Sequence, residues 1–270
     1  PPVFSGWESG QELLIVIYRK EKVMNRMIVL LSVVFLVGIA QAGNVFAAAG
    51  SVSGKISYKG TPPPPEHFTV SKNPEFCGAE RDFFHITVKN GVLQGAAILI
   101  EGVSGGKPMQ GAEAKMTAKD CVFLPFTGVV EKRGKGKKNA PDIEIVNEDL
   151  VIHNPHPFEM RGMSRRTLWN VGLPEKGDKL NKKLRVKKGR VVKIQCDQHD
   201  FMHAWLRVAT NSYWTLAGTD GSYKIDGVPP GKYQLVAWHP ILGEQKKEIT
   251  IGDGKVAEAS FAFSGSGSGR

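Results

Sequence analysis

The stretch IQCDQHDFMHAW (residues 194–205) places four potential metal ligands close together: Cys196, His199, Met202 and His203. The whole chain of 270 residues has three cysteines and seven histidines, so this density indicates a metal site. A thiolate is the softest protein ligand, imidazole is intermediate, and a thioether is soft and weak. One Cys, two His and one Met therefore favour copper over zinc, magnesium or calcium.

Zinc and haem sites fit the sequence of this loop less well. Structural zinc is usually held by four Cys or His ligands with a paired C-x-x-C, and the chain has no such pair. It also lacks the C-x-x-C-H motif that attaches a c-type haem. The metal-free alternative, a buried cysteine beside core histidines, is disfavoured by the regular spacing of the ligand types.

The fourth ligand is expected from a second loop. Cys196, His199 and Met202 come from a single loop that follows a predicted strand, so the remaining ligand should lie at the end of a neighbouring strand. The segment NEDLVIHNPHPF (147–158) fits, because it follows a predicted strand near residues 143–146 and offers His153 or His156.

The two ligand segments together carry a family resemblance. IHNPHPF, followed by CDQHDFM and the predicted strand AWLRVAT, resembles the cupredoxins, and the short C-x-x-H-x-x-M loop is amicyanin-like. The resemblance implies a blue copper site with imidazoles from His153 and His199, a thiolate from Cys196 and an axial thioether from Met202. It further implies that Asn154 ties the two ligand loops together near the thiolate.

Two positions depart from this pattern. Asp200 stands where amicyanin-like loops have proline, so a carboxylate beside the copper would lower the reduction potential and remove a stiffening residue. His203 follows Met202 and can compete as a ligand, which would make the site more tetragonal. His156 is the alternative to His153, although a role outside the ligand set is the more common one for such a residue.

The ligand set predicts an electron carrier and no enzyme. A closed site with four protein ligands leaves no open position for a substrate. In cupredoxins the second imidazole reaches the surface through an apolar patch, which here implies His199 with Phe201 as the electron-transfer surface. The alternatives are a periplasmic copper-binding or delivery protein, or a structural β-sandwich that has lost its redox role.

The rest of the chain predicts an all-β fold. Short Val-, Ile- and Thr-rich runs alternate with turns rich in Gly and Pro. GSVSGKISYKG and TDGSYKIDGVPPGKYQLVAW, at the two ends, resemble the carboxypeptidase-regulatory-like domains, which are transthyretin-like β-sandwiches. The combination resembles secreted bacterial proteins that join a plastocyanin-like domain to such a sandwich. It implies a Greek-key cupredoxin sandwich together with a smaller transthyretin-like one.

The predicted boundaries follow from this organisation. We expect the first strands of the regulatory-like sandwich and a linker over 48–81, the cupredoxin domain over 82–210, the remainder of the regulatory-like sandwich over 211–264, and a flexible tail over 265–270. Within the middle domain, KKLRVKKGRVVKI (182–194) predicts a hairpin that turns near residues 188–189.

The N-terminal residues predict export. Residues 24–47 have a Met, a positive charge, an apolar run and small residues, which is typical of a secretory signal peptide and predicts a periplasmic or secreted protein without a membrane span after cleavage. Residues 1–23 are interpreted as an untranslated upstream extension. In an exported chain Cys77 and Cys121 can pair in a disulfide, which would leave Cys196 free for copper.

The charge predicts the kind of partner. The net charge is +10, with basic residues concentrated in 131–138 and 175–190. Such charge favours a redox protein with an acidic docking surface. Nucleic acid is not expected, because the basic runs lack interleaved aromatic residues for base stacking.

Overall fold

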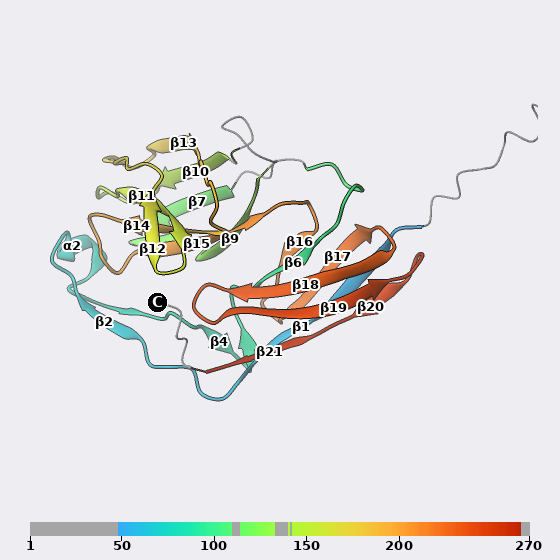
Figure 1. The fold of residues 1–270 in the computed structure, drawn as a ribbon. Coiled ribbons are helices and arrows are strands. Elements are labelled where there is room, and N and C mark those ends of the chain that lie inside the picture. Colours follow the sequence, from blue (N-terminus) through green and yellow to red (C-terminus); the bar gives the residue numbers. More distant parts are fainter. Residues whose placement is uncertain (1–47, 110–113, 133–139, 141, 266–270) are drawn as a thin grey trace, which may run out of the picture. The chain divides into compact units, whose positions relative to one another are not determined.

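The computed structural model describes residues 48–109, 114–132, 140 and 142–265. The predicted all-β class is confirmed, since the only helix among these residues is the four-residue α2 (Pro74–Cys77) and strands dominate the rest (Figure 1). The predicted upstream extension, signal peptide and most of the basic run 131–138 lie outside the described residues. No described segment forms a helix with the length and hydropathy of a membrane span.

The first sandwich has two sheets with an apolar core between them. One sheet has the order β13 (Lys179–Lys183), β10 (Asp142–Asn147), β7 (Ala114–Lys119), β8 (Val122–Leu124). The other has the order β12 (Ser164–Thr167), β11 (Pro155–Arg161), β14 (Val191–Cys196), β15 (His203–Ala209), β9 (Thr127–Glu131). Side chains alternate across a strand, so Ile143 and Ile145 of β10 and Val192 and Ile194 of β14 all enter this core.

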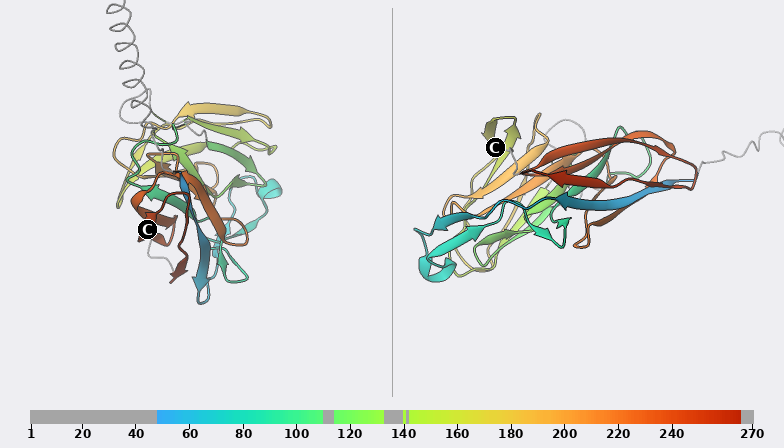
Figure 2. Two further views of the ribbon diagram at one scale, coloured as in Figure 1. Left: turned by 90° about the vertical axis from the view of Figure 1, so that its right-hand side faces the viewer. Right: turned by 90° about the horizontal axis from the view of Figure 1, so that it is seen from below.

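The second sandwich joins the two ends of the described chain. Its first sheet contains β17 (Ser222–Val228), β1 (Gly50–Lys59), β20 (Val256–Glu258) and β21 (Phe261–Ser264). Its second sheet has the order β16 (Trp214–Leu216), β6 (Ala97–Glu101), β18 (Gly231–His239), β19 (Gly243–Ile251). Figure 2 shows the blue opening strand beside the red C-terminal strands, in agreement with the pairing of β1 with β20 and β21.

A glycine allows this close packing of the chain ends. A Cβ atom at Gly54 would lie 1.7 Å from the carbonyl oxygen of Ala259, so no larger residue fits. The hydroxyl of Tyr223 donates to the same carbonyl. Gly54 therefore fixes the approach between β1 and the segment that precedes β21.

β15 is the wall that the two sandwiches share. All seven of its residues are buried, because Ala204, Leu206 and Val208 face the first core while Trp205 faces the second. Arg207 is 3% exposed and its guanidinium lies 2.9 Å from Glu244 of β19 and 3.5 Å from Glu101 of β6. Apolar packing and the ion pairs of the buried Arg207 thus connect the sandwiches.

Two predictions about the middle of the chain are wrong. β6 lies inside the range 82–210 but pairs with β16 and β18 of the second sandwich. Residues 182–194 form no hairpin, since β13 and β14 belong to opposite sheets of the first sandwich. In both cases the local pattern gives a strand correctly, but periodicity alone does not determine which sheet a strand joins.

A short flap precedes these strands and covers the first sandwich. It consists of β2 (Glu66–Thr69), α2 and β3 (Glu80–Phe83), and it is followed by the small hairpin β4 (Val88–Lys89) and β5 (Val92–Leu93). Val70 and Cys77 are buried in the first core. The predicted range 48–81 is therefore divided, because β1 joins the second sandwich whereas the flap packs on the first.

Candidate metal centre

Three of the predicted ligands lie together at one end of the first sandwich. β11 pairs antiparallel with β14 so that Pro155 is opposite Cys196, the last residue of β14. His153 lies just before Pro155 and forms an isolated bridge with Leu173, and His199 lies in the loop between β14 and β15. This strand register brings together residues that are far apart in the sequence.

The separations of the ligand atoms fit a metal. Cys196 Sγ lies 3.9 Å from His153 Nδ1 and 3.7 Å from His199 Nδ1, and all three residues are buried. A metal about 2.0 Å from nitrogen and about 2.3 Å from sulfur, at an angle of about 120°, holds the two atoms about 3.7 Å apart. The three residues therefore fit a trigonal His₂Cys site with little movement.

The outer nitrogen of each imidazole has a partner of its own. His153 Nε2 lies 2.8 Å from Oδ2 of Asp149, so the proton on Nε2 is donated to the carboxylate. His199 Nε2 lies 3.6 Å from Sγ of Cys77. With a proton on Nε2, each ring turns the lone pair of Nδ1 toward Cys196, which is the tautomer that a metal needs.

Asp149 is itself held in place by a tight turn. The carboxylate is 3% exposed and accepts N–H groups from Asp120 at 2.7 Å and Cys121 at 2.9 Å. Both donors lie in the β7–β8 turn with φ angles of 51° and 57°, which directs two successive amides to one side. Cys121 also lies near Asp149 and His153, but its sulfur is bonded to Cys77 and offers no thiolate.

The protonation states of the metal-free site favour cation binding. Burial raises the pKa of the Cys196 thiol, although N–H groups of Asn154, Gln198 and His199 act in the opposite direction. Burial, followed by the neighbouring His153, lowers the pKa of His199 to about 4. Burial also lowers the pKa of His153 despite Asp149. Both rings are therefore neutral at neutral pH, and a bound metal would displace the thiol proton.

Met202 completes the ligand loop through its backbone. Its carbonyl accepts the N–H of Cys196 at 3.0 Å, and its own N–H donates to the carbonyl of His199 at 3.1 Å. The Met202 side chain is 1% exposed and packs in the first core. The loop is thus closed on itself, while the axial role of the thioether stays a prediction.

Neither alternative ligand belongs to the cluster. His156 is bonded through Nδ1 to Asp197 at 3.0 Å and through Nε2 to Thr167 at 3.0 Å. The His203 ring stacks on Phe83 instead, with 4.3 Å between ring centroids. Among the described residues, the group of donors that contains a free thiol consists of His153, Cys196 and His199.

Asn154 and Asp200, which the sequence analysis placed beside the ligands, make different contacts with the site. The Asn154 N–H donates to Cys196 Sγ at 3.3 Å, and its carbonyl accepts from Asp197 at 3.0 Å, so its backbone links the two loops. Asp200 is exposed, and its charge acts to raise the pKa of His199.

The expected electron-transfer surface is wrong in one respect: His199 and Phe201 are each 2% exposed. The flap covers them, with Phe68 of β2 at 6.1 Å from the Phe201 ring and the Arg81 guanidinium at 5.6 Å. The disulfide between Cys77 and Cys121 fastens the flap to the β7–β8 turn. Similarity in the ligand loops carries no information about this additional segment.

Sequence reasoning missed Asp149 and the contact of Cys77 with the site. The available signal for Asp149 was its place four residues before His153, in a polar turn that interrupts an apolar segment. Cys77 gave no such signal, because its position against His199 depends on the fold of the flap.

Comparisons with known proteins match parts of the chain. Residues 182–259 match the family model "Polysaccharide lyase family 4, domain II", which is under half of the chain. Of this region, residues from 211 on were expected to belong to a carboxypeptidase-regulatory-like sandwich and those up to 210 to the cupredoxin domain. The matched model is of another kind, so the regulatory-like expectation is corrected. That expectation rested on turn motifs, and such motifs occur in many small β-sandwiches. A search of curated proteins gives no match.

Similar solved structures include several cupredoxins. A purple cupredoxin from Nitrosopumilus maritimus is 18% identical over 36% of this chain and 99% of its own, with a TM-score of 0.28. Amicyanin from Paracoccus versutus is 13% identical over 42% of this chain and 97% of its own, with a TM-score of 0.27. A copper-containing nitrite reductase from Thermus scotoductus is 16% identical, with a TM-score of 0.28 over 41% of this chain and 25% of its own. At these values, the assignment of the site rests on its own residues.

Proposed function

We propose that this chain binds copper in a type 1 (blue) centre and carries single electrons between redox partners. The observation that supports this proposal is the buried group of His153 Nδ1, His199 Nδ1 and Cys196 Sγ, with separations that suit a trigonal site. These residues would hold the ion, with Met202 as the weak axial ligand. Bound copper would supply the Cu(II)/Cu(I) couple.

The surrounding residues would keep the site rigid and dry. Asp149 orients the His153 ring, and the N–H of Asn154 stabilises a thiolate at Cys196. The flap excludes water from His199. A closed site of this kind has no position for a substrate, which favours an electron carrier over an enzyme.

The test is an optical and EPR spectrum of the Cu(II)-loaded protein. We expect an intense visible band from thiolate-to-copper charge transfer, because Cys196 is the only thiolate in the group. Cys196→Ala and His199→Ala should abolish the band. His156→Ala should keep it, since that imidazole lies outside the cluster.

The same experiment can reject the proposal. Copper uptake that is indifferent to Cys196 would show that the metal binds elsewhere. A spectrum lost equally in the His156→Ala control would show that the three-residue cluster is not the site. Circular dichroism on each metal-free variant separates loss of copper from loss of folding.

Retention of copper without electron transfer is the second candidate, and one observation favours it. The disulfide and flap lie between His199 and solvent, and electron transfer weakens with distance. Phe76, next to Cys77 in this cover, is 38% exposed. Stopped-flow absorbance tests this, after the copper-loaded protein is mixed with a soluble redox protein. A carrier should exchange electrons with it rapidly, whereas a copper-retaining protein should keep its oxidation state after mixing.

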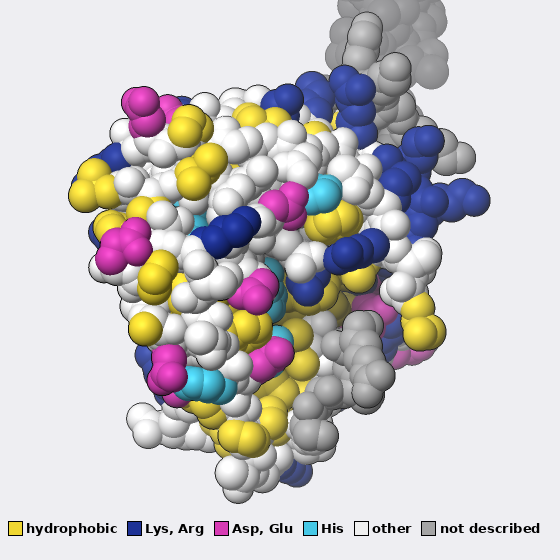
Figure 3. Space-filling model, turned by 90° about the vertical axis from the view of Figure 1, so that its left-hand side faces the viewer, with side chains coloured by type: hydrophobic (Ala, Val, Ile, Leu, Met, Phe, Trp, Pro, Cys, Tyr) yellow, Lys and Arg dark blue, Asp and Glu magenta, His cyan; other side chains and the backbone are white. Residues whose placement is uncertain are grey.

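We propose further that the protein is exported and that its partner is acidic. The disulfide and the signal-like residues 24–47 support export to an oxidising compartment. On the face shown in Figure 3, Lys and Arg gather along one edge, while acidic side chains are scattered over the rest. Electron exchange with an acidic partner should therefore slow as salt increases. N-terminal sequencing of the native protein tests the cleavage.

A further inference from the structure

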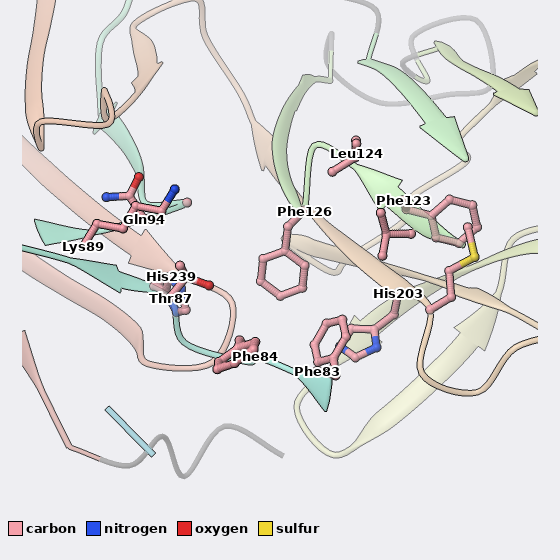
Figure 4. Close-up of a pocket in the computed structure, with 13 residues that line it drawn as sticks. Phe83, Phe84, Thr87, Lys89, Gln94, Phe123, Leu124, Phe126, His203 and His239 are labelled. Carbon is pink, nitrogen blue, oxygen red and sulfur yellow. The ribbon is translucent and has the colours of Figure 1, made fainter. Parts of the chain in front are cut away.

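A cavity of about 310 Å³ adjoins the ligand loop. Met202 and His203 line it, together with four phenylalanines: Phe83, Phe84, Phe123 and Phe126. Figure 4 shows His203 and Phe83 on one side, Phe126 between, and Gln94 with Lys89 across from them. At this size, near the lower end of about 300–1,000 Å³ for ligand pockets, it suits a small molecule.

His203 gives this apolar cavity one buried polar group. The residue is 6% exposed, and its ring makes no hydrogen bond with any other part of the chain that the structure describes. Its neighbours are rings, with centroids 4.3 Å away in Phe83 and 5.9 Å away in Phe126. A ligand that hydrogen-bonds to His203 would therefore not have to displace an existing partner of this imidazole.

The other histidine that lines the cavity is already paired. His239 Nδ1 accepts the N–H groups of Ile241 at 3.3 Å and Leu242 at 3.4 Å, and the ring also bonds to the backbone of Gln94. Its place in the fold is thereby explained without a ligand. His203 is left as the buried group that can select a ligand by hydrogen bonding.

The exposed part of the cavity lining combines large apolar side chains with the polar residues Thr87 and Lys89. Phe84 is 55% exposed and Leu124 is 47% exposed, and both line the same cavity. Aromatic walls bind planar rings by offset or edge-to-face contact. A wall rich in phenylalanine, with the buried imidazole of His203 among these rings, therefore suits a flat, uncharged molecule with one polar substituent.

We propose that this cavity binds a neutral, planar aromatic alcohol of the phenol or naphthol class, with its hydroxyl paired to His203. The ring would lie among Phe83, Phe84 and Phe126. The inference uses no property of the copper centre, so it stands or falls separately from the proposed function. It is tested on the metal-free protein and again on the copper-loaded protein.

The probes are 2-naphthol and naphthalene, which differ only in the hydroxyl, and binding is followed by their fluorescence anisotropy. We expect saturable one-to-one binding, about five- to tenfold tighter for 2-naphthol because of one hydrogen bond. His203→Phe keeps an aromatic ring but removes that bond, so it should weaken 2-naphthol to the level of naphthalene and leave naphthalene unchanged.

Two further variants make the result decisive. Thr87 lines the cavity and is exposed, so Thr87→Trp should fill the space and abolish binding of both probes without disturbing the core. Leu150→Ala, at an exposed residue away from the cavity, should change neither. The proposal is overturned if 2-naphthol shows no saturable binding, if naphthalene binds equally tightly, or if Thr87→Trp leaves binding intact. Because Thr87 is exposed, Thr87→Trp should fold, so this variant tests the proposal even if His203→Phe does not fold.

Discussion

Asp149 and Glu159 are both buried carboxylates of the first sandwich, and their surroundings differ in one informative way. Asp149 is 3% exposed and Glu159 of β11 is fully buried. Backbone amides hold both: Asp149 accepts two N–H groups from residues 120–121, and Glu159 accepts three from residues 187–189. Each carboxylate thus fastens a turn to the ligand-bearing part of the sandwich.

The difference lies in the charges that face them. Glu159 Oε2 lies 2.9 Å from the Arg161 guanidinium and 2.5 Å from that of Arg166. Within the described residues, the partner of Asp149 at salt-bridge distance is the His153 imidazole, which is neutral because burial lowers its pKa. A buried charge is costly unless it is compensated. Glu159 is compensated by the folded chain, whereas Asp149 would be compensated fully by a cation on the far side of the His153 ring.

Glu159→Gln should have the largest effect on the free energy of unfolding. The substitution removes the charge between Arg161 and Arg166 and weakens the hold on residues 187–189. Breaking a fully buried pair costs about 3–5 kcal/mol, and because both guanidinium groups are about one third exposed, we expect a loss near the lower end of this range. Chemical denaturation of the metal-free protein measures it, and the copper affinity of the folded variant should be nearly unchanged.

A surface carboxylate is the matched control for this prediction. Glu148 lies 3.5 Å from Lys119, and both side chains are about half exposed, so Glu148→Gln should change stability by less than about 1 kcal/mol. Similar losses in the two variants would contradict the central role of Glu159.

Asp149→Asn should lower metal affinity more than it lowers the stability of the metal-free protein, the reverse of the effect expected for Glu159→Gln. The amide keeps the shape but removes the charge that orients and polarises His153. Loss of such an outer partner lowers metal affinity by about 10–100-fold, or about 1.4–2.7 kcal/mol. Competition with a chelator measures the affinity, and unfolding of the metal-free variant should be affected less than in Glu159→Gln.

Asp197→Asn serves as the control for the metal effect. Asp197 also pairs with an imidazole, that of His156, but this pair lies outside the ligand cluster. Equal losses of copper affinity in Asp149→Asn and Asp197→Asn would indicate a general charge effect. That result would contradict a specific role of Asp149 in metal binding.

The sequence predicts the ligand cluster well because its signals are local and chemically distinct. Cys196 and His199 are three positions apart in one loop, and the strand before His153 has a clear apolar alternation. The all-β class follows from similar short patterns and is confirmed by the structure. The chemistry of a few side chains was enough to nominate residues that the fold brings together.

The errors concern contacts that no local pattern encodes. β6 is buried over most of its length, so alternation does not show which sheet it joins. Residues 187–189 read as a hairpin turn, but they cross between sheets because their amides bind Glu159. The burial of His199 depends on the flap, a segment more than a hundred residues earlier in the chain.

The smallest expected effect is the loss of the stability that Glu159 contributes when the pH is lowered. Burial alone would raise the pKa of Glu159, but the hydrogen bonds of Arg161, the backbone N–H groups of residues 188–189 and Arg166 together hold it well below its ordinary value of 4.5. A carboxyl with a lowered folded-state pKa adds stability above its unfolded pKa, and this stability is lost as the pH falls below it. The stability difference between the native chain and Glu159→Gln should therefore be constant near neutral pH and shrink by about 1–2 kcal/mol by about pH 3. Groups that titrate in both proteins, including the buried histidines, cancel in this difference. Urea unfolding of the metal-free proteins across this range measures it, and a difference that stays constant down to pH 3 would show that the charge of Glu159 is not what holds residues 187–189.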